Sequence, residues 1–275
     1  MKFNFLKSLK IWKDSAMFAF VLLAGIESIM SIVAISLDDI IKKWWWRLFF
    51  IVAVYAVLTI LTLIVKYLQT KKEINLDIRG IKVTIKQGDI FKAVGWKIIP
   101  FNEHFETIVD DIFIAKNSLN GKLILEHLDK DGVEELKSAI GADDKSPILV
   151  QFDDKTNKWK YPLGRIKIFR DYMLLALTHF NEQNEAHTTR AQYEQTLRIM
   201  WQEISRTYAN KPIFLPLIGT GITRFDDIPE KNYTELLRCI LCTLRTSNLH
   251  INQPITILLT EEALSKINLY ELKGV

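Results

Sequence analysis

Residues 213–222 read Ile-Phe-Leu-Pro-Leu-Ile-Gly-Thr-Gly-Ile. The apolar run from Ile213 to Ile218 is typical of a short buried strand, and it ends directly in a Gly-Thr-Gly turn. Because glycine lacks a Cβ atom, backbone N–H groups in such a turn can approach an anion closely. Ligands of open α/β sheets bind at these carboxyl ends of strands. The stretch therefore predicts either a tight turn or an anion-binding loop made of Gly219, Thr220, Gly221 and Ile222.

Two residues that follow this turn favour a nucleotide as the ligand. Arg224 offers a cation for a phosphate, and Phe225 offers a face on which a base can stack. About 130 residues earlier, the alternating strand 82–87 runs into Gly88-Asp89-Ile90. Asp89 is either a turn or helix cap or a ligand contact, and we favour the ligand contact because the second motif accompanies it.

Apolar runs and helical periodicity alternate through the remainder of the chain after residue 75. Such alternation is typical of an α/β layered domain with a mixed central sheet flanked by helices. The segment 110–144 shows one short helix, at 132–140, and otherwise has the pattern of a loop. The expected strands are 81–85, 94–99, 148–152, 165–177, 213–218 and 255–259, and the longer expected helices are 189–208 and 231–245.

Two apolar runs near the start of the chain are long enough to cross a bilayer. Between Ser15 and Leu37 the only charge is Glu27, and residues 48–65 carry none. About 20 apolar residues in a helix span a hydrocarbon core of roughly 30 Å. A cleavable signal peptide is the alternative for the first run, but signal h-regions are only ~7–15 residues long. We therefore predict a transmembrane hairpin at 1–72, with spans of about 15–37 and 45–67, followed by one domain at 76–275.

Basic residues flank both spans and indicate the orientation of the hairpin. Lysines precede the first span and follow the second, and such flanks favour the cytoplasmic side and anionic headgroups. Trp44, Trp45 and Trp46 between the spans suit the headgroup boundary. The expected protein is a multi-pass membrane protein with cytoplasmic N- and C-termini. The basic residues are Lys2, Lys7, Lys10, Lys13, Lys66, Lys71, Lys72 and Arg79.

An ionisable residue lies inside the first span. A carboxyl group near the centre of a bilayer costs several kcal/mol on insertion scales, and it usually faces a partner or water. Glu27 and Ser28 recur at helical spacing with other small or polar residues, and Tyr55 lies at similar depth on the second span. Glu27 either bonds Tyr55 and holds the hairpin together, or belongs to a face that meets other subunits and lines a polar pathway.

Composition excludes several other classes of function. The net charge is only +4, and the basic residues form no stripe interleaved with aromatic side chains, so we expect no nucleic-acid partner. The two cysteines, Cys239 and Cys242, have C-x-x-C spacing but fall in a helical apolar pattern without a second Cys/His pair. A pair of small buried residues on a helix is favoured over a redox or metal site. We predict no metal and no cofactor.

Together, Gly88-Asp89-Ile90 and Pro216-Leu-Ile-Gly-Thr-Gly-Ile222 resemble the macro domain, a fold that binds ADP-ribose. The resemblance implies that Asp89, with Ile90, contacts adenine and that the loop 219–222 wraps the diphosphate. Phe101, Asn102 and Glu103 stand where the family carries an Asn-Ala-Ala-Asn segment, and only Asn102 matches it. The family's first phosphate loop is reduced here to Ser118-Leu-Asn-Gly-Lys122, with Gly121 as the candidate contact.

The whole arrangement, a two-helix hairpin and then a divergent macro domain, resembles the membrane-anchored macro-domain effectors of Thoeris antiphage systems. The resemblance implies a TIR-domain partner that converts NAD into an ADP-ribose-derived signal, a histidine conjugate. It also implies that the macro domain binds this signal, that the chain forms a homo-oligomer in the bacterial inner membrane and that this membrane is then disrupted. The expected function is therefore recognition of a ligand and not catalysis, because the residues with which macro-domain hydrolases position water are degraded here.

Two alternatives belong to other classes. One is a membrane-tethered ADP-ribosyl hydrolase that uses Asn102, Glu103 or His104, although the sequence shows no third member of such a constellation. The other is a scaffold that recruits ADP-ribosylated proteins to the membrane and has an inert hairpin. Product analysis separates the first alternative from a reader. Retained toxicity after an exchange of the hairpin identifies the second.

Overall fold

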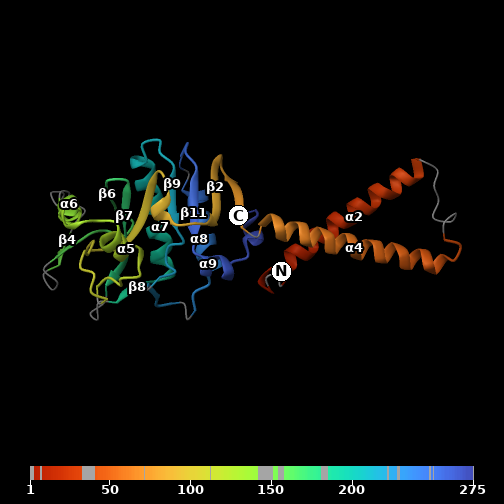
Figure 1. Ribbon diagram of the computed structural model, residues 1–275, viewed down its shortest axis with the longest axis horizontal. Coiled ribbons are helices and arrows are strands. Elements are labelled where there is room, and N and C mark those ends of the chain that lie inside the picture. The colour runs from red at the N-terminus through yellow and green to blue at the C-terminus, as the bar shows by residue number, and fades with distance from the viewer. Residues whose placement is uncertain are drawn as a thin grey trace. The chain divides into compact units, whose positions relative to one another are not determined.

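The chain folds into two compact units (Figure 1). The smaller unit comprises Met1–Ile74 together with Ser265–Gly274, and the larger one comprises Asn75–Leu264. The sequence analysis predicted a domain at 76–275, whereas these compact units place residues 265–274 with the hairpin. This computed structural model describes every residue except 1–2, 7, 33–40, 71, 112, 142–150, 154–157, 181–184, 222, 228–229, 248, 250 and 275.

Two long helices dominate the smaller unit, and Figure 1 shows them crossing near one end and diverging toward the other. Both are long and apolar enough to cross a membrane, over Leu9–Ser31 and Trp44–Thr70. Most of their large apolar side chains are exposed, as expected of surfaces that face lipid. The predicted residues 33–37 of the first span lie outside the described part. The helices of this unit are α1 (Phe3–Leu6), α2 (Leu9–Ile32) and α4 (Trp44–Thr70).

Hydroxyl groups join α2 and α4 where they cross. The Tyr55 hydroxyl donates to the carbonyl of Ala16 at 3.2 Å, and Thr62 Oγ1 donates to the carbonyl of Ser15 at 3.3 Å. The alternative in which Tyr55 bonds Glu27 is therefore wrong, because Tyr55 reaches the first half of α2 instead.

The predicted assembly residues on α2 lie on the half that diverges from α4. The Glu27 side chain is exposed, and within the described residues it makes no hydrogen bond or ion pair. Ser28 Oγ donates to the carbonyl of Ala24, one turn back on the same helix, at 2.8 Å. A single copy of the chain thus leaves a carboxyl group on an otherwise apolar helix surface, and inside a bilayer such a group would cost several kcal/mol.

Residues 269–272 pack on the base of the hairpin, which is the end where α2 begins and α4 ends, within the smaller unit. The 3₁₀ helix η2 (Leu269–Leu272) places Tyr270 in a buried cluster with Phe5, Ile11 and Leu63. The Tyr270 hydroxyl donates to Asp14 Oδ2 at 2.8 Å. Burial and this bond raise the Tyr270 pKa above its ordinary value, so the phenol stays protonated. This segment is part of the base of the hairpin.

A mixed sheet forms the centre of the larger unit, in the strand order β1-β2-β11-β9-β3-β7-β8-β10, with β6 also paired to β7. The strands β2, β11, β9, β3 and β7 are all parallel, so their carboxyl ends share one edge. The mixed sheet predicted from the sequence is confirmed. The bounds are β1 (Glu73–Ile78), β2 (Ile81–Gln87), β3 (Trp96–Asn102), β6 (Ile166–Phe169), β7 (Tyr172–Phe180), β8 (Ala186–Thr188), β9 (Ile213–Pro216), β10 (Arg224–Phe225) and β11 (Ile255–Leu259).

Helices pack on this sheet through side chains that alternate along the strands. Leu123 and Leu136, from α5 and α6, share a buried cluster with Ile99, Leu174 and Ala176. The helices α7 and α8 pack together, and Trp201 Nε1 donates to Thr243 Oγ1 at 3.2 Å in that interface. The helical bounds are η1 (Ile90–Lys92), α5 (Leu119–Glu126), α6 (Lys130–Gly141), α7 (Arg190–Thr207), α8 (Tyr233–Thr246) and α9 (Glu261–Lys266).

Three sequence predictions about these elements were wrong. The stretch 165–177 is two antiparallel strands, β6 and β7, because the chain turns at Arg170, whose φ is +52°. The expected buried strand 148–152 corresponds in part to β4 (Gln151–Asp153), which pairs only with β5 (Lys158–Lys160) and leaves Phe152 45% exposed. Residues 148–150 lie outside the described part. The helix α5 was missed because it spans only two turns and has little periodicity.

Candidate functional site

A cavity of about 500 Å³ lies along the carboxyl edge of the five parallel strands. The order of the strands in the sheet determines which residues form the wall of this cavity. Asp89 follows β2, Thr260 follows β11, the loop Leu217–Gly221 follows β9, Asn102 ends β3, and Phe180 ends β7. Motifs more than 100 residues apart in the sequence therefore lie in a row. The ends of this row, Asp89 and Phe180, are separated by three intervening strands, so the cavity suits an elongated ligand.

The β2 end of the cavity carries the predicted aspartate. Asp89 Oδ1 accepts a hydrogen bond from the N–H of Phe91 at 3.0 Å and caps η1. Asp89 is exposed, and its second carboxylate oxygen has no partner among the described residues. Phe91 stacks on His127 with ring centroids 3.9 Å apart, and both line the cavity together with Ile90. The cap and the free acceptor coexist, so the two interpretations of Asp89 do not exclude each other.

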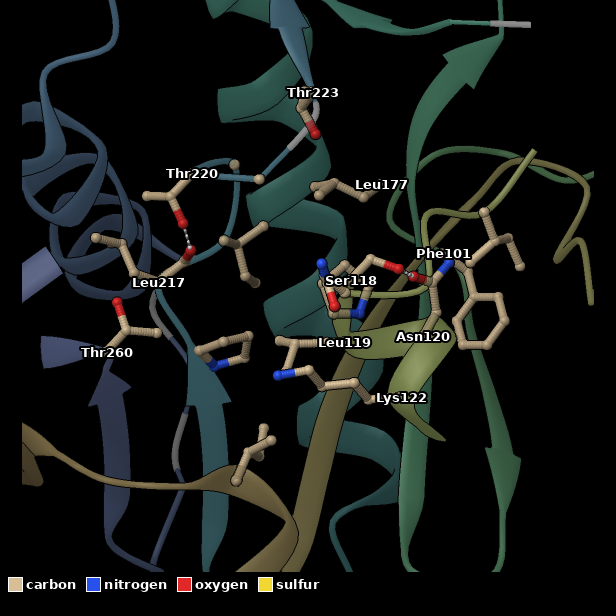
Figure 2. Close-up of a pocket in the computed structure, with 18 of the residues that line it drawn as sticks. Phe101, Ser118, Leu119, Asn120, Lys122, Leu177, Leu217, Thr220, Thr223 and Thr260 are labelled. Carbon is tan, nitrogen blue, oxygen red and sulfur yellow. Dashed lines mark hydrogen bonds between the residues drawn. The ribbon is translucent and has the colours of Figure 1, made fainter. Parts of the chain in front are cut away.

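The glycine loop forms the middle of the wall (Figure 2). Gly219 has φ +88°, which an L side chain rarely adopts, and an added Cβ would lie 3.2 Å from the Tyr193 ring. Within the described part of the chain, the N–H groups of Gly219, Thr220 and Gly221 have no acceptor. Backbone N–H groups that are free at a cavity wall can bind an anion. Ile222 lies outside the described residues.

The opposite wall comes from the start of α5. Figure 2 shows Ser118, Asn120 and Lys122 across the cavity from the loop that carries Leu217 and Thr220. Gly121 itself does not line the cavity, because it packs against the carbonyl of Ala115, where a Cβ would be only 2.4 Å from the oxygen. The neighbouring residues Ser118, Asn120 and Lys122 line the cavity where Gly121 was predicted to do so, and Lys122 adds a positive charge.

The residues at the end of β3 divide between cavity and core. Phe101 and Asn102 line the cavity, whereas Glu103 and His104 do not. Asn102 Oδ1 accepts hydrogen bonds from the N–H groups of His104 and Glu106, at 3.0 and 3.1 Å, so it also stabilises the following turn. His104 Nδ1 lies 3.0 Å from the carbonyl of Trp159. The pair that the hydrolase alternative needs is therefore not brought to the cavity with Asn102.

Glu103 belongs to a buried charge cluster and is only 1% exposed. It bonds His179 and pairs with Lys160 at 3.1 Å, and it accepts the N–H of Phe180 at 3.3 Å. Burial by itself would raise the pKa of this carboxyl group. The contacts with His179 and Lys160 outweigh burial and hold the Glu103 pKa below its ordinary value of 4.5. Because Phe180 lines the cavity, the cluster supports the far end of the site.

This lowered pKa predicts a loss of stability in acid. A carboxyl group with a lower pKa in the folded state stabilises the fold above its unfolded pKa, and the contribution is lost as the pH falls through the folded value. We expect the thermal midpoint to fall less between pH 7 and pH 3 in Glu103→Gln than in the wild type. The exposed Glu134→Gln should keep the wild-type profile. An unchanged profile in Glu103→Gln would contradict this assignment.

Arg224 and Phe225, predicted as ligand contacts, do not line the cavity. Arg224 forms two contacts of 2.8 Å with Glu185, and Phe225 packs edge-on against Tyr193 with centroids 5.4 Å apart. Thr223, which the sequence analysis passed over, does line it. Both excluded side chains are held by residues from distant parts of the chain, which the local sequence pattern does not show.

The two cysteines lie on α8 as predicted, although both are only partly buried. Burial and the neighbouring Glu194 raise the pKa of Cys239 to about 12, so this thiol stays protonated at neutral pH. In the described part of the chain, His, Cys, Asp and Glu side chains form no group that could hold a metal ion.

A mixed sheet with a ligand-sized cavity at its carboxyl edge, between a glycine loop and an aspartate-capped turn, defines the class of macro-domain proteins. The chain belongs to the family described as Thoeris protein ThsA, Macro domain, which matches residues 83–260. It is similar to Thoeris protein ThsA of Bacillus amyloliquefaciens (strain Y2), with 35% identity over 227 residues, 78% of this chain and 75% of that protein.

Solved macrodomains of Oceanobacillus iheyensis are also similar. A structure with ADP has 14% identity and a TM-score of 0.45, over 73% of this chain and 95% of the other. A mutant with ADPR has 15% identity and a TM-score of 0.46, over 73% and 96% of the two chains.

Proposed function

We propose that this chain is a bacterial antiviral effector whose macro domain reads an ADP-ribose-derived second messenger. The messenger is the product of a TIR-domain partner, and its expected form is a histidine conjugate of ADP-ribose. Binding triggers homo-oligomerisation at the inner membrane, where the N- and C-termini are cytoplasmic. The assembled hairpins disrupt the membrane and cause abortive infection. Membership of the ThsA family supports this setting.

The observation that carries the proposal is the arrangement of the cavity wall. Asp89 keeps one carboxylate oxygen free at the β2 end, where it can accept a hydrogen bond from the adenine amino group. The unpaired N–H groups of Gly219, Thr220 and Gly221 follow two strands away and suit a diphosphate. Beyond them, Asn102 and Phe180 leave room for the second ribose and its substituent. This order of groups matches the order of the parts of ADP-ribose.

The same wall favours a reader over an enzyme. A hydrolase needs a group that activates water at the distal ribose. Glu103 and His104, the candidates from the sequence, lie outside the cavity and are engaged elsewhere. The charges that face the cavity, among them Asp89 and Lys122, fit recognition of a nucleotide.

The chain itself provides a route from the ligand to the hairpin. Thr260 and Ala263 line the cavity, and Thr260 Oγ1 accepts the N–H of Ala263 at the start of α9. The 3₁₀ helix η2 begins six residues after Ala263, and its Tyr270 packs on the base of the hairpin. A ligand shifts an equilibrium only through different affinities for its two states. Contacts with Thr260 and Ala263 would give such a difference, which α9 passes on.

Calorimetry of the full chain in lipid nanodiscs tests the proposal. We expect ADP-ribose and its histidine conjugate to bind, and Asp89→Asn to weaken both by at least about tenfold, because a hydrogen bond to a charged group is worth about 1.5–3 kcal/mol. Lys86→Gln, an exposed change on β2, the strand that precedes Asp89, is the control. Absence of binding by the wild type would refute the proposal. Release of free ADP-ribose from an ADP-ribosylated substrate would instead support the hydrolase alternative.

A further inference from the structure

The carbonyl groups of the glycine loop are held by side-chain donors. Thr220 Oγ1 donates to the carbonyl of Leu217 at 2.9 Å, and the Tyr193 hydroxyl donates to the carbonyl of Ile218 at 2.8 Å. Lys231 Nζ donates to the carbonyl of Gly221 at 2.6 Å. A carbonyl dipole that points at a phosphate would repel it, so these bonds favour a loop that presents its N–H groups to the cavity.

The donors from Tyr193 and Lys231 come from behind the loop. Both residues line a second cavity of about 210 Å³, and neither lines the larger one. Gly219 separates the two spaces, because a Cβ on it would lie 3.2 Å from Tyr193 and 3.6 Å from Phe225. Tyr193 is only 1% exposed, and its hydroxyl is held by the hydrogen bond to the Ile218 carbonyl. The loop is thus a thin wall with its supports on one side and the candidate ligand site on the other.

Lys231 also carries a charge that the described residues do not neutralise. Its ammonium group forms no ion pair with a carboxylate within the described part of the chain, and the Gly221 carbonyl is its hydrogen-bond partner there. Burial lowers the Lys231 pKa below its ordinary value, and a bound anion nearby would oppose this shift. A cation one peptide unit behind an anion site attracts the anion through a partly dry environment.

We propose that Lys231 and Tyr193 are positioning residues for the diphosphate of the ligand. Tyr193 fixes the Ile218 peptide, and Lys231 fixes the Gly221 peptide and supplies the positive charge behind the loop. Neither residue belongs to the glycine motif, so the sequence pattern did not predict either of them. This inference rests on the proposed function, since it assigns the loop to a diphosphate.

The test compares ligands with and without phosphates on the full chain in nanodiscs. We expect Lys231→Met to weaken ADP-ribose binding by at least about tenfold, which is 1.4 kcal/mol, and to leave adenosine binding unchanged. It should also reduce the salt dependence of ADP-ribose binding. Lys231→Arg should restore most of the affinity. Tyr193→Phe should weaken ADP-ribose by about three- to tenfold, as expected for one hydrogen bond.

Lys211→Met is the matched control. Lys211 is an exposed lysine that precedes β9, whereas the glycine loop follows β9, so Lys211 lies at the opposite end of that strand from the loop. It should bind ADP-ribose as the wild type does. Equal losses for adenosine and ADP-ribose in Lys231→Met would show general damage and would overturn the inference, as would unchanged binding of ADP-ribose. A wild-type chain that binds neither ligand would refute the proposed function itself.

Discussion

Gly219→Val is expected to abolish ADP-ribose binding, with a loss of affinity of at least about 100-fold. The added side chain meets the Tyr193 ring at 3.2 Å, and the residue has φ +88°, so the loop must change its conformation. At least two N–H contacts to the diphosphate are then lost, and each hydrogen bond to a charged group is worth about 1.5–3 kcal/mol. Calorimetry of the full chain in nanodiscs measures this loss.

Gly80→Val is a matched control for the backbone strain at Gly219. Gly80 is also a glycine with a positive φ. It has nearly the same φ, +86°, in the turn between β1 and β2, and an added Cβ meets nothing within 4 Å. A left-handed conformation costs a residue with a Cβ about 1–2 kcal/mol, so both variants should lose some thermal stability. Only Gly219→Val should lose the ligand. Wild-type affinity in Gly219→Val would show that the loop does not contact the diphosphate.

Glu27→Leu is expected to bind the messenger normally and to cause no growth arrest. In one copy, the Glu27 carboxyl group is exposed on an apolar helix and has no partner among the described residues. Insertion of an ionisable group at this depth costs several kcal/mol, and a second copy of the chain can supply the missing hydrogen bonds. Leucine removes this requirement for a partner. Toxicity in cells and ligand-dependent particle size in nanodiscs measure the effect.

Two further variants separate the causes. Ile26→Leu changes the neighbouring exposed apolar residue and should behave as the wild type. Glu27→Gln keeps the ability to form hydrogen bonds, so it should still assemble, and its residual toxicity reports on the role of the charge. If Glu27→Leu cells arrest growth as the wild type does, the hairpin is an anchor and Glu27 does not mediate assembly. Toxicity after exchange of the whole hairpin would support the scaffold alternative.

Local patterns predicted several parts of this protein correctly. The two long apolar helices and the mixed sheet were visible because hydrophobic periodicity reports on burial over a few neighbouring residues. The glycine turn after Ile218 was visible because it is a property of consecutive residues. The cap at Asp89 was one of the two alternatives for that residue, although the ligand contact was favoured. Strand order then placed Asp89 and the glycine loop at one cavity, as their assignment to one ligand requires.

Contacts between distant residues were decided only by the tertiary structure. Glu103 was read as a ligand contact but pairs with His179, 76 residues later. The Tyr193 and Lys231 supports of the loop, the helix α5 opposite it and the packing of Tyr270 on the hairpin likewise depend on long-range pairing. The sequence by itself determined that a hairpin precedes an α/β domain with a glycine turn. The fold decided which side chains face the cavity, because facing depends on partners that no local window contains.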